Sequence, residues 1–186
     1  MLLISKIDII GEFLRDSSAA LTGSFIAKKT GMNQKTVSNF LKELETEHIL
    51  KSKVQGKNKL YFLNLDNMEI VLNFLMAVEH LRVMNFYKKN IIVKEIVGKI
   101  LPFVQGIGVI FGSYASGNQK RGSDLDILVV GKCNEREIDK ISELYKIDIS
   151  LKIYPKLDRD ILIKEVLKNH VVIKNADDFI RGIVNG

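Results

Sequence analysis

The sequence predicts an α+β protein: a mainly helical N-terminal segment ending in a hairpin, a helical connector, and a C-terminal α/β segment with a small mixed sheet. Apolar side chains recur at helical spacing through most of the first hundred residues, interrupted by a pair of strand-like runs around Gly56. Beyond residue 101, short apolar strands alternate with helices. We therefore expect three segments, residues 1–65, 66–101 and 102–186.

Three helices are expected in the first segment. The first covers residues 3–15, where the apolar side chains share one face. The second matches "GSFIAKKTG", with Ser24 as its N-cap and Gly31 as its end. Asn33 caps the third helix, and its buried stripe consists of Val37, Leu41 and Leu44.

Two strand-like runs then flank Gly56-Lys57-Asn58, a sequence typical of a hairpin turn. Three helices followed by a basic hairpin resemble the winged helix-turn-helix, a DNA-binding family, over residues 1–65. The resemblance implies that the third helix and the hairpin contact double-stranded DNA. The candidate DNA-binding residues are Gln34, Lys35, Thr36, Ser38 and Asn39 on the helix, and Lys51, Lys53, Lys57 and Lys59 on the hairpin.

The charge distribution is compatible with DNA binding. The net charge is +6, and residues 1–65 hold ten Lys and Arg against six Asp and Glu. Two alternatives stay open: a winged helix that binds protein, and lysines that only keep the surface soluble.

Residues 66–101 predict two helices that are too apolar for a flexible linker. An apolar stripe runs along the first of them and consists of Val71, Leu72, Leu75, Val78, Leu81 and Met84. It fits either a core-facing stripe or the seam of a homodimer. Because DNA-binding modules of this kind commonly act as dimers, a homodimer is expected.

The third segment carries a spaced motif. Gly112 and Ser113 follow the apolar run "GIGVIF", and ten residues later Asp124-Leu125-Asp126 opens a second apolar run. This G-S-x10-D-x-D pattern resembles the minimal nucleotidyltransferases of the DNA polymerase β superfamily, over residues 90–175. The resemblance implies metal-dependent transfer of a nucleoside monophosphate from a nucleoside triphosphate to a hydroxyl acceptor, with release of pyrophosphate.

Elementary chemistry supports the same interpretation. Residues two apart on a strand project to one side, so Asp124 and Asp126 share a face. Adjacent carboxylates repel each other unless a cation lies between them or one is protonated, and Mg²⁺ or Mn²⁺ prefers such oxygen ligands. Gly112 permits close backbone approach to a phosphate, and Ser113 can donate its hydroxyl and amide. The alternative is a solvated strand start with two unremarkable acids.

Asp148, on the polar face of "KIDISLKIY", is the candidate third carboxylate, as metal ligand or base. Its alternative is an exposed polar face. Lys120 and Arg121 lie between the two halves of the motif as candidate phosphate contacts, or as a solvated loop. Family members often carry arginine three residues after the motif serine, where this chain has Ser116. Phosphate binding is then weaker, or moved to Lys120 and Arg121.

The resemblance implies a further role, because minimal nucleotidyltransferases often serve as antitoxins paired with a small helical HEPN toxin, which some of them nucleotidylate on a tyrosine. Two rivals stay open. One is a transcriptional regulator whose second domain only senses a nucleotide or a partner. The other is antibiotic modification, which needs an acceptor pocket that the residues after position 150 offer little material to build.

Targeting features are sparse. The only cysteine, Cys133, excludes an internal disulfide. No apolar run approaches the length of a membrane span, and the N-terminal residues lack the pattern of a signal peptide. A cytoplasmic protein without membrane contact is therefore expected.

Overall fold

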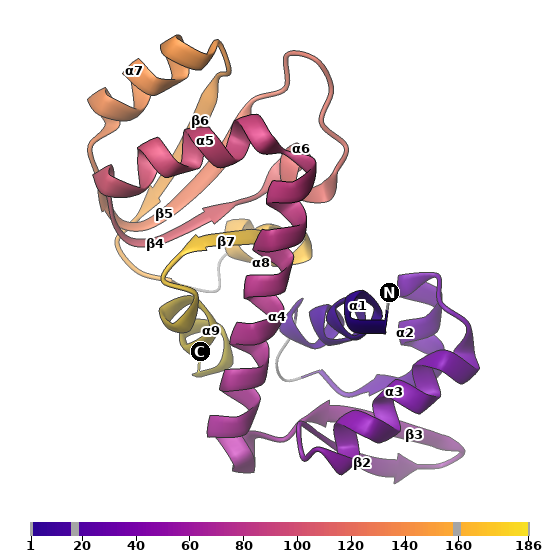
Figure 1. Ribbon diagram of the computed structural model, residues 1–186. Coiled ribbons are helices and arrows are strands. Elements are labelled where there is room, and N and C mark those ends of the chain that lie inside the picture. The colour runs from indigo at the N-terminus through magenta and orange to yellow at the C-terminus, as the bar shows by residue number, and fades with distance from the viewer. Residues whose placement is uncertain (1, 16–18, 158–160, 186) are drawn as a thin grey trace. The chain divides into compact units, whose positions relative to one another are not determined.

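The protein is described by a computed structural model, which covers residues 2–15, 19–157 and 161–185 (Figure 1). Its fold class is α+β, as predicted. The chain divides into two compact units, Met1–Val78 and Glu79–Gly186. This division falls within a long helix, α4 (Met68–Lys89), and not at the segment boundaries expected from the sequence, which stay predictions.

The described residues of the first unit form three helices and a small sheet. The elements are α1 (Leu2–Arg15), β1 (Leu21–Thr22), α2 (Gly23–Thr30), α3 (Gln34–Thr46), β2 (Leu50–Gln55) and β3 (Asn58–Leu63). The strands pair antiparallel in the order β1-β3-β2. Three helices, a strand between the first two, and a C-terminal hairpin make up a winged helix, as the sequence pattern indicated.

The helix ends confirm two of the three expected caps. Asn33 caps α3, because its side-chain oxygen accepts from the Lys35 amide at 2.8 Å. Gly31 ends α2 in the left-handed conformation, with φ 69°. Ser24 was wrongly expected to cap α2: the cap is Thr22, whose hydroxyl accepts from the Phe25 amide at 3.1 Å. Thr22 is still extended because it pairs with Leu60 of β3.

A 3-10 turn, η1 (Leu65–Asn67), leads into α4. Most of the predicted apolar stripe in the N-terminal half of this helix is buried, at 3% exposure or less, namely Val71, Leu72, Leu75 and Val78. Met84, further along the helix, is 53% exposed. The core interpretation therefore holds for these four residues, and the homodimer stays a prediction.

The second unit is built on a four-stranded sheet. Its elements after α4 are α5 (Ile91–Ile100), η2 (Leu101–Phe103), β4 (Val104–Ile110), α6 (Gly112–Ser116), β5 (Leu125–Cys133), α7 (Glu135–Tyr145), β6 (Ile149–Tyr154), α8 (Ile161–Lys168), β7 (Val171–Lys174) and α9 (Ala176–Asn185). The strand order is β6-β5-β4-β7. β5 and β6 run parallel, while β4 is antiparallel to both of its neighbours, so the sheet is mixed as predicted.

The two faces of this sheet differ: one packs against helices, and the other carries Asp126. The odd-numbered residues of β5, such as Leu125 and Ile127, belong to the same apolar cluster as side chains of α5 and α7. Figure 1 shows both helices on one side of the sheet. Because side chains alternate along a strand, Asp126 lies on the opposite face.

Two glycines face each other across the β4–β5 ladder. Gly106 and Gly131 are direct partners in the β4–β5 ladder. A Cβ on Gly106 would lie 2.2 Å from the Val130 carbonyl oxygen, and a Cβ on Gly131 would lie 2.2 Å from that of Gln105. Their φ angles are +108° and +135°, which side chains disfavour. Both positions therefore require glycine.

A buried ionic cluster lies in the second unit. Glu79 is fully buried and His170 is 4% exposed. One guanidinium nitrogen of Arg82, Nη1, is 2.6 Å from both Glu79 Oε1 and His170 Nε2. Arginine only donates hydrogen bonds, so Nε2 accepts and the imidazole is neutral. Burial lowers the pKa of His170, and the charge of Arg82 lowers it further against the opposing effect of Glu79.

Candidate functional site

The two halves of the Gly-Ser and Asp-x-Asp motif meet in space. β4 pairs with β5 up to Ile110, and the Phe111 amide then donates to the Asp126 carbonyl at 3.1 Å. The chain turns at Gly112, with φ +68°, directly over the Asp126 side chain. A Cβ on Gly112 would lie 2.2 Å from Asp126 Oδ2. Only glycine permits this approach, so the Gly-Ser turn is placed against the carboxylate.

Asp126 is half-buried and carries the strongest electrostatic perturbation of this site. Burial raises its pKa, and the negative charge of Asp124 raises it further. A hydrogen bond from Ser150 and the positive charge of Lys152 act in the opposite direction. Burial and the neighbouring carboxylate thus both disfavour the charged form of Asp126 in the absence of a cation.

Asp148 lies at the start of β6, next to the carboxylate pair in the ladder. Its carbonyl accepts from the Leu125 amide at 2.7 Å, and its side chain is exposed. Within residues 2–15, 19–157 and 161–185, no three His, Cys, Asp or Glu side chains gather closely enough to hold a metal ion. The structure thus brings Asp124, Asp126 and Gly112 together, while Asp148 does not close a three-carboxylate set.

The remaining motif residues flank the carboxylates. Ser113 is the second residue of the short helix α6, and its carbonyl accepts from the Ser116 hydroxyl at 3.0 Å. Lys120 and Arg121 are exposed in the loop between α6 and β5. This loop is closed by the Lys120 amide, which donates to the Ser123 hydroxyl at 2.9 Å. The two basic side chains therefore belong to a solvent-facing turn.

Sequence reasoning assigned no role to two residues on β6. Ser150 is the ladder partner of Asp126, and Lys152 is the partner of Leu128. Both share a strand face with Asp148 by alternation, so the pattern "DISLK" already contained the signal. The missing information was the register that aligns this face with Asp126.

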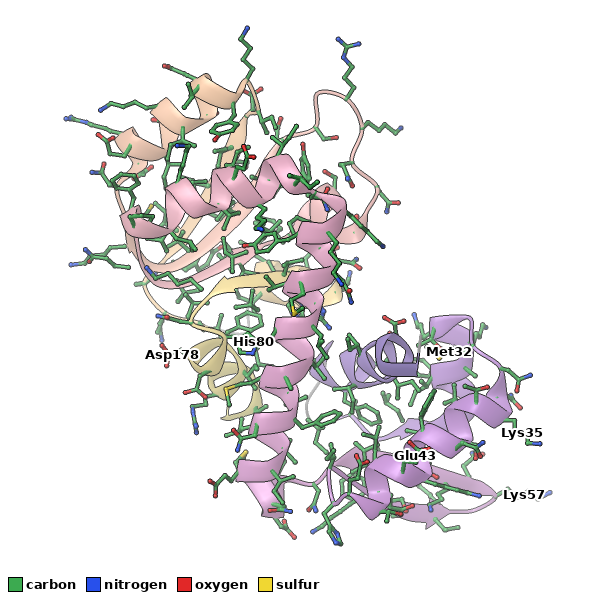
Figure 2. All side chains as sticks on the ribbon, in the orientation of Figure 1. Met32, Lys35, Glu43, Lys57, His80 and Asp178 are labelled. Carbon is green, nitrogen blue, oxygen red and sulfur yellow. The ribbon has the colours of Figure 1, made fainter. Side chains whose placement is uncertain are left out.

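A second candidate site lies on the winged helix. The proposed contact residues of α3 are half-buried at Ser38 and exposed at Gln34, Lys35, Thr36 and Asn39. The opposite face of α3 is buried through Val37, Phe40, Leu41 and Leu44. Figure 2 shows Lys35 and Lys57 projecting from the same end of this unit, one from the start of α3 and one from the hairpin tip.

The four hairpin lysines are not equivalent. Lys51 forms an ion pair with Asp66. Lys59 donates to Glu45 at 2.7 Å and lies 5.0 Å from the centre of the Tyr61 ring. Lys53 and Lys57 are exposed, and no ion pair joins either to another residue in the described part of the chain. Lys53 and Lys57 are therefore the more available pair for phosphate groups.

The ion pair between Lys59 and Glu45 shifts the pKa of both groups. The hydrogen bond from Lys59 holds the pKa of Glu45 below its usual range, with a further hydrogen bond from Ser52. The same hydrogen bond raises the pKa of Lys59. Glu45 therefore joins α3 to both strands of the hairpin.

Comparison with known proteins supports the class of the second unit. Residues 91–180, just under half of the chain, match the family model described as "Nucleotidyltransferase domain". Gly112, Asp126 and the sheet that holds them lie inside the matched range. The C-terminal part of the chain is thus similar to domains that transfer nucleoside monophosphates, which use a nucleoside triphosphate and a divalent metal.

Among solved structures, the chain has a distant likeness to MepR, a transcription regulator of the Staphylococcus aureus multidrug efflux pump MepA. The two are 20% identical, with a TM-score of 0.36, and the match covers 48% of this chain and 63% of that chain. The chain thus spans less than two thirds of the length of MepR. Comparison with curated protein sequences gave no match.

Within the described residues, no helix joins the length and the apolar character that a bilayer crossing requires.

Proposed function

We propose that the protein is a DNA-binding nucleotidyltransferase that transfers a nucleoside monophosphate from a nucleoside triphosphate to a hydroxyl group of a partner. The observation that carries the proposal is the apposition of Gly112 and Asp126, because it joins a close-approach turn to a pair of carboxylates. The match of residues 91–180 to the nucleotidyltransferase family model supports the same reaction class.

Asp124 and Asp126 would hold a Mg²⁺ or Mn²⁺ ion, since two neighbouring carboxylates supply the oxygen ligands that a hard divalent cation prefers. Such an ion supplies charge neutralisation for the triphosphate and for the departing pyrophosphate. Asp148 is the proposed third ligand or general base. Gly112 and Ser113 would contact the triphosphate, with Lys120 and Arg121 as further proposed phosphate contacts.

The proposed reaction forms one bond at the α-phosphorus of the nucleotide and breaks another. The acceptor hydroxyl oxygen forms a bond to the α-phosphorus of the nucleotide, and the bond between that phosphorus and the α–β bridging oxygen breaks. Pyrophosphate leaves with the electron pair of the broken bond. The hydroxyl proton passes to a nearby base, for which the exposed Asp148 carboxylate is the proposed residue.

We infer three finer assignments from the winged helix and from the family resemblance. The first unit binds double-stranded DNA, as the exposed polar face of α3 supports. The acceptor is a HEPN-type toxin, and the protein acts as its antitoxin while regulating the shared operon. It works as a homodimer in the cytoplasm.

Calorimetric titration tests the transferase assignment. ATP, GTP, CTP and UTP are titrated with Mg²⁺ into the wild type and into the Asp124→Asn/Asp126→Asn variant. We expect at least one nucleotide to bind the wild type and to lose at least tenfold in affinity in the variant. The control is Glu135→Gln/Asp139→Asn, which removes two exposed acids of α7 and leaves binding unchanged. Failure of all four nucleotides to bind the wild type would contradict the proposal.

Two observations favour a second function, a regulator that senses the nucleotide without transferring it. The Ser116 hydroxyl bonds to the Ser113 carbonyl, at the position where family members often carry arginine, and the described residues close no three-carboxylate set. An α-³²P-labelled nucleotide distinguishes the two functions. Label transferred to a small helical partner encoded by a neighbouring gene supports the transferase, whereas nucleotide binding without transfer to that partner supports the sensor.

A further inference from the structure

β6, the strand next to the carboxylate pair, carries a basic side chain, Lys152, that is not part of the Gly-Ser and Asp-x-Asp motif. The parallel ladder aligns Asp126 with Ser150 and Leu128 with Lys152. Side chains at these aligned positions point to the same face of the sheet. Lys152 is thus one strand over and two residues along from Asp126, on the same face of the sheet.

We propose that Lys152 binds the phosphate chain of the nucleotide, and that Ser150 positions the Asp126 carboxylate beside it. This inference rests on the proposed function and deepens it. It assigns phosphate binding chiefly to Lys152 on β6, and not to the basic residues of the loop between α6 and β5.

The contacts of Asp126 support this assignment. The parallel register holds Lys152 on the face of the sheet that carries Asp126, on the adjoining strand. Lys152 is exposed and forms no ion pair within the described part of the chain, so its ammonium group can receive a ligand. An ammonium group at the end of a flexible stem suits the several oxygens of a triphosphate.

The alternative cations are less well placed. Lys120 and Arg121 project from an exposed turn, and the β5–β6 ladder includes neither of them. The side chain at position 116 is a serine whose hydroxyl is engaged by its own helix. A strand in a paired sheet holds a side chain more firmly than a surface turn does, which favours Lys152 as the fixed contact.

Ser150 has a separate task. It donates a hydrogen bond to Asp126 from the directly opposed ladder position. A carboxylate held in this way keeps one orientation relative to Gly112 above it. Ser150 is therefore a positioning residue, and it need not touch the nucleotide.

Two binding measurements separate this role from a merely structural one. Mn²⁺ alone is titrated and followed by electron paramagnetic resonance, and ATP with Mg²⁺ is titrated by calorimetry. For Lys152→Ala we expect ATP affinity to fall at least tenfold, while Mn²⁺ affinity stays equal or rises because a repelling charge is gone. For Ser150→Ala we expect weaker Mn²⁺ binding, with rescue by Ser150→Thr.

Controls use lysines of similar exposure. Lys132→Ala removes an exposed lysine from the far end of β5, and Lys120→Ala removes the loop lysine. ATP affinity close to that of the wild type is expected in the Lys132 variant, with a smaller loss in the Lys120 variant than in the Lys152 variant.

The outcomes are distinguishable. If Lys152→Ala binds ATP as the wild type does, the inference is overturned and the proposed function survives. The inference is also overturned if Lys152→Ala loses Mn²⁺ and ATP together, since Lys152 then supports the structure only. If the wild type binds no nucleotide, the proposed function and the inference fall together.

Discussion

Gly112 touches Asp126 from across the β4–β5 ladder, and this contact leaves no room for a side chain. A Cβ at this position would lie 2.2 Å from the carboxylate oxygen, and the backbone has a positive φ of 68°. The opposite end of α6 offers a natural comparison. Gly117 has nearly the same φ, 72°, but a Cβ there would meet no described atom within 4 Å.

Gly112→Ala is therefore expected to abolish nucleotide binding, while Gly117→Ala is not. Both variants incur the strain of a left-handed backbone, about 1–2 kcal/mol. Only Gly112→Ala also displaces Asp126. Calorimetric titration of ATP and chemical denaturation of both variants test this difference. Equal loss of binding in the two variants would show that strain in α6, and not the contact with Asp126, is responsible.

Asp126→Asn is expected to stabilise the protein at neutral pH while it removes metal binding. The pKa of Asp126 is raised in the folded state by burial and by Asp124, so folding disfavours the charged form. The stability associated with this group is present at low pH and lost as the pH rises through the raised pKa. The gain from the substitution should therefore be largest at pH 7 and vanish toward the ordinary value of 3.8.

Thermal unfolding from pH 4 to pH 7 measures this effect, with Asp139→Asn on the surface of α7 as the control. A destabilised Asp126→Asn protein at pH 7 would contradict the assigned charge balance.

Lys57 and Lys51 are expected to differ in DNA binding. Lys57 is exposed at the hairpin tip, whereas Lys51 is already paired with Asp66. Lys57→Ala should weaken binding to a duplex severalfold and reduce the slope of log K against log salt by about 1, because one phosphate contact is lost. Fluorescence anisotropy between 50 and 200 mM salt measures both. Lys51→Ala should have the smaller effect, and the reverse order would exclude Lys57 as a phosphate contact.

His170 makes the stability of the second unit sensitive to mild acid. Its pKa is lowered in the folded state, mainly by burial and then by Arg82. A base with a lowered pKa contributes stability that is present above its unfolded value of 6.5 and lost as the pH falls below it. Glu79, the other titratable group facing it in this cluster, has a lowered pKa and responds only at pH values below 4.5.

The free energy of unfolding should therefore fall between pH 6.5 and pH 5, by at most about 1.4 kcal/mol per pH unit for a single proton. His170→Gln should flatten this slope, and His48→Gln, at an exposed position of the first unit, should leave it unchanged. Denaturant titrations at several pH values give the slopes. A slope that persists in His170→Gln would assign the pH dependence to another group.

The order of the elements could be predicted because helices and strands repeat their apolar positions at different periods. The cap of α2 could not, since Thr22 becomes the cap only when β1 pairs with β3, far along the chain. The difference between Lys51 and Lys57 was hidden for a similar reason. Asp66, the partner of Lys51, is fifteen residues away in the sequence.

The spacing between Gly112 and Asp126 predicted that the two would act together, and the ladder supplied the contact itself. The part played by Ser150 and Lys152 needed the parallel register of β6, which no local pattern encodes. The candidate site thus depends partly on the motif and partly on the register of the strands.

The register of β4 against β5, which places Gly112 over Asp126, involves a pair of residues remote from the site. The facing glycines Gly106 and Gly131 pair four positions along the ladder from Ile127, the neighbour of Asp126. Because strand faces alternate, sliding β4 by a single residue against β5 would carry Gly112 off the carboxylate. Side chains at the two glycines would collide with the backbone of the opposite strand, so this register requires glycine at both positions. Inherited substitutions at Gly106 or Gly131 would therefore disturb the contact between Gly112 and Asp126, although neither glycine belongs to the site.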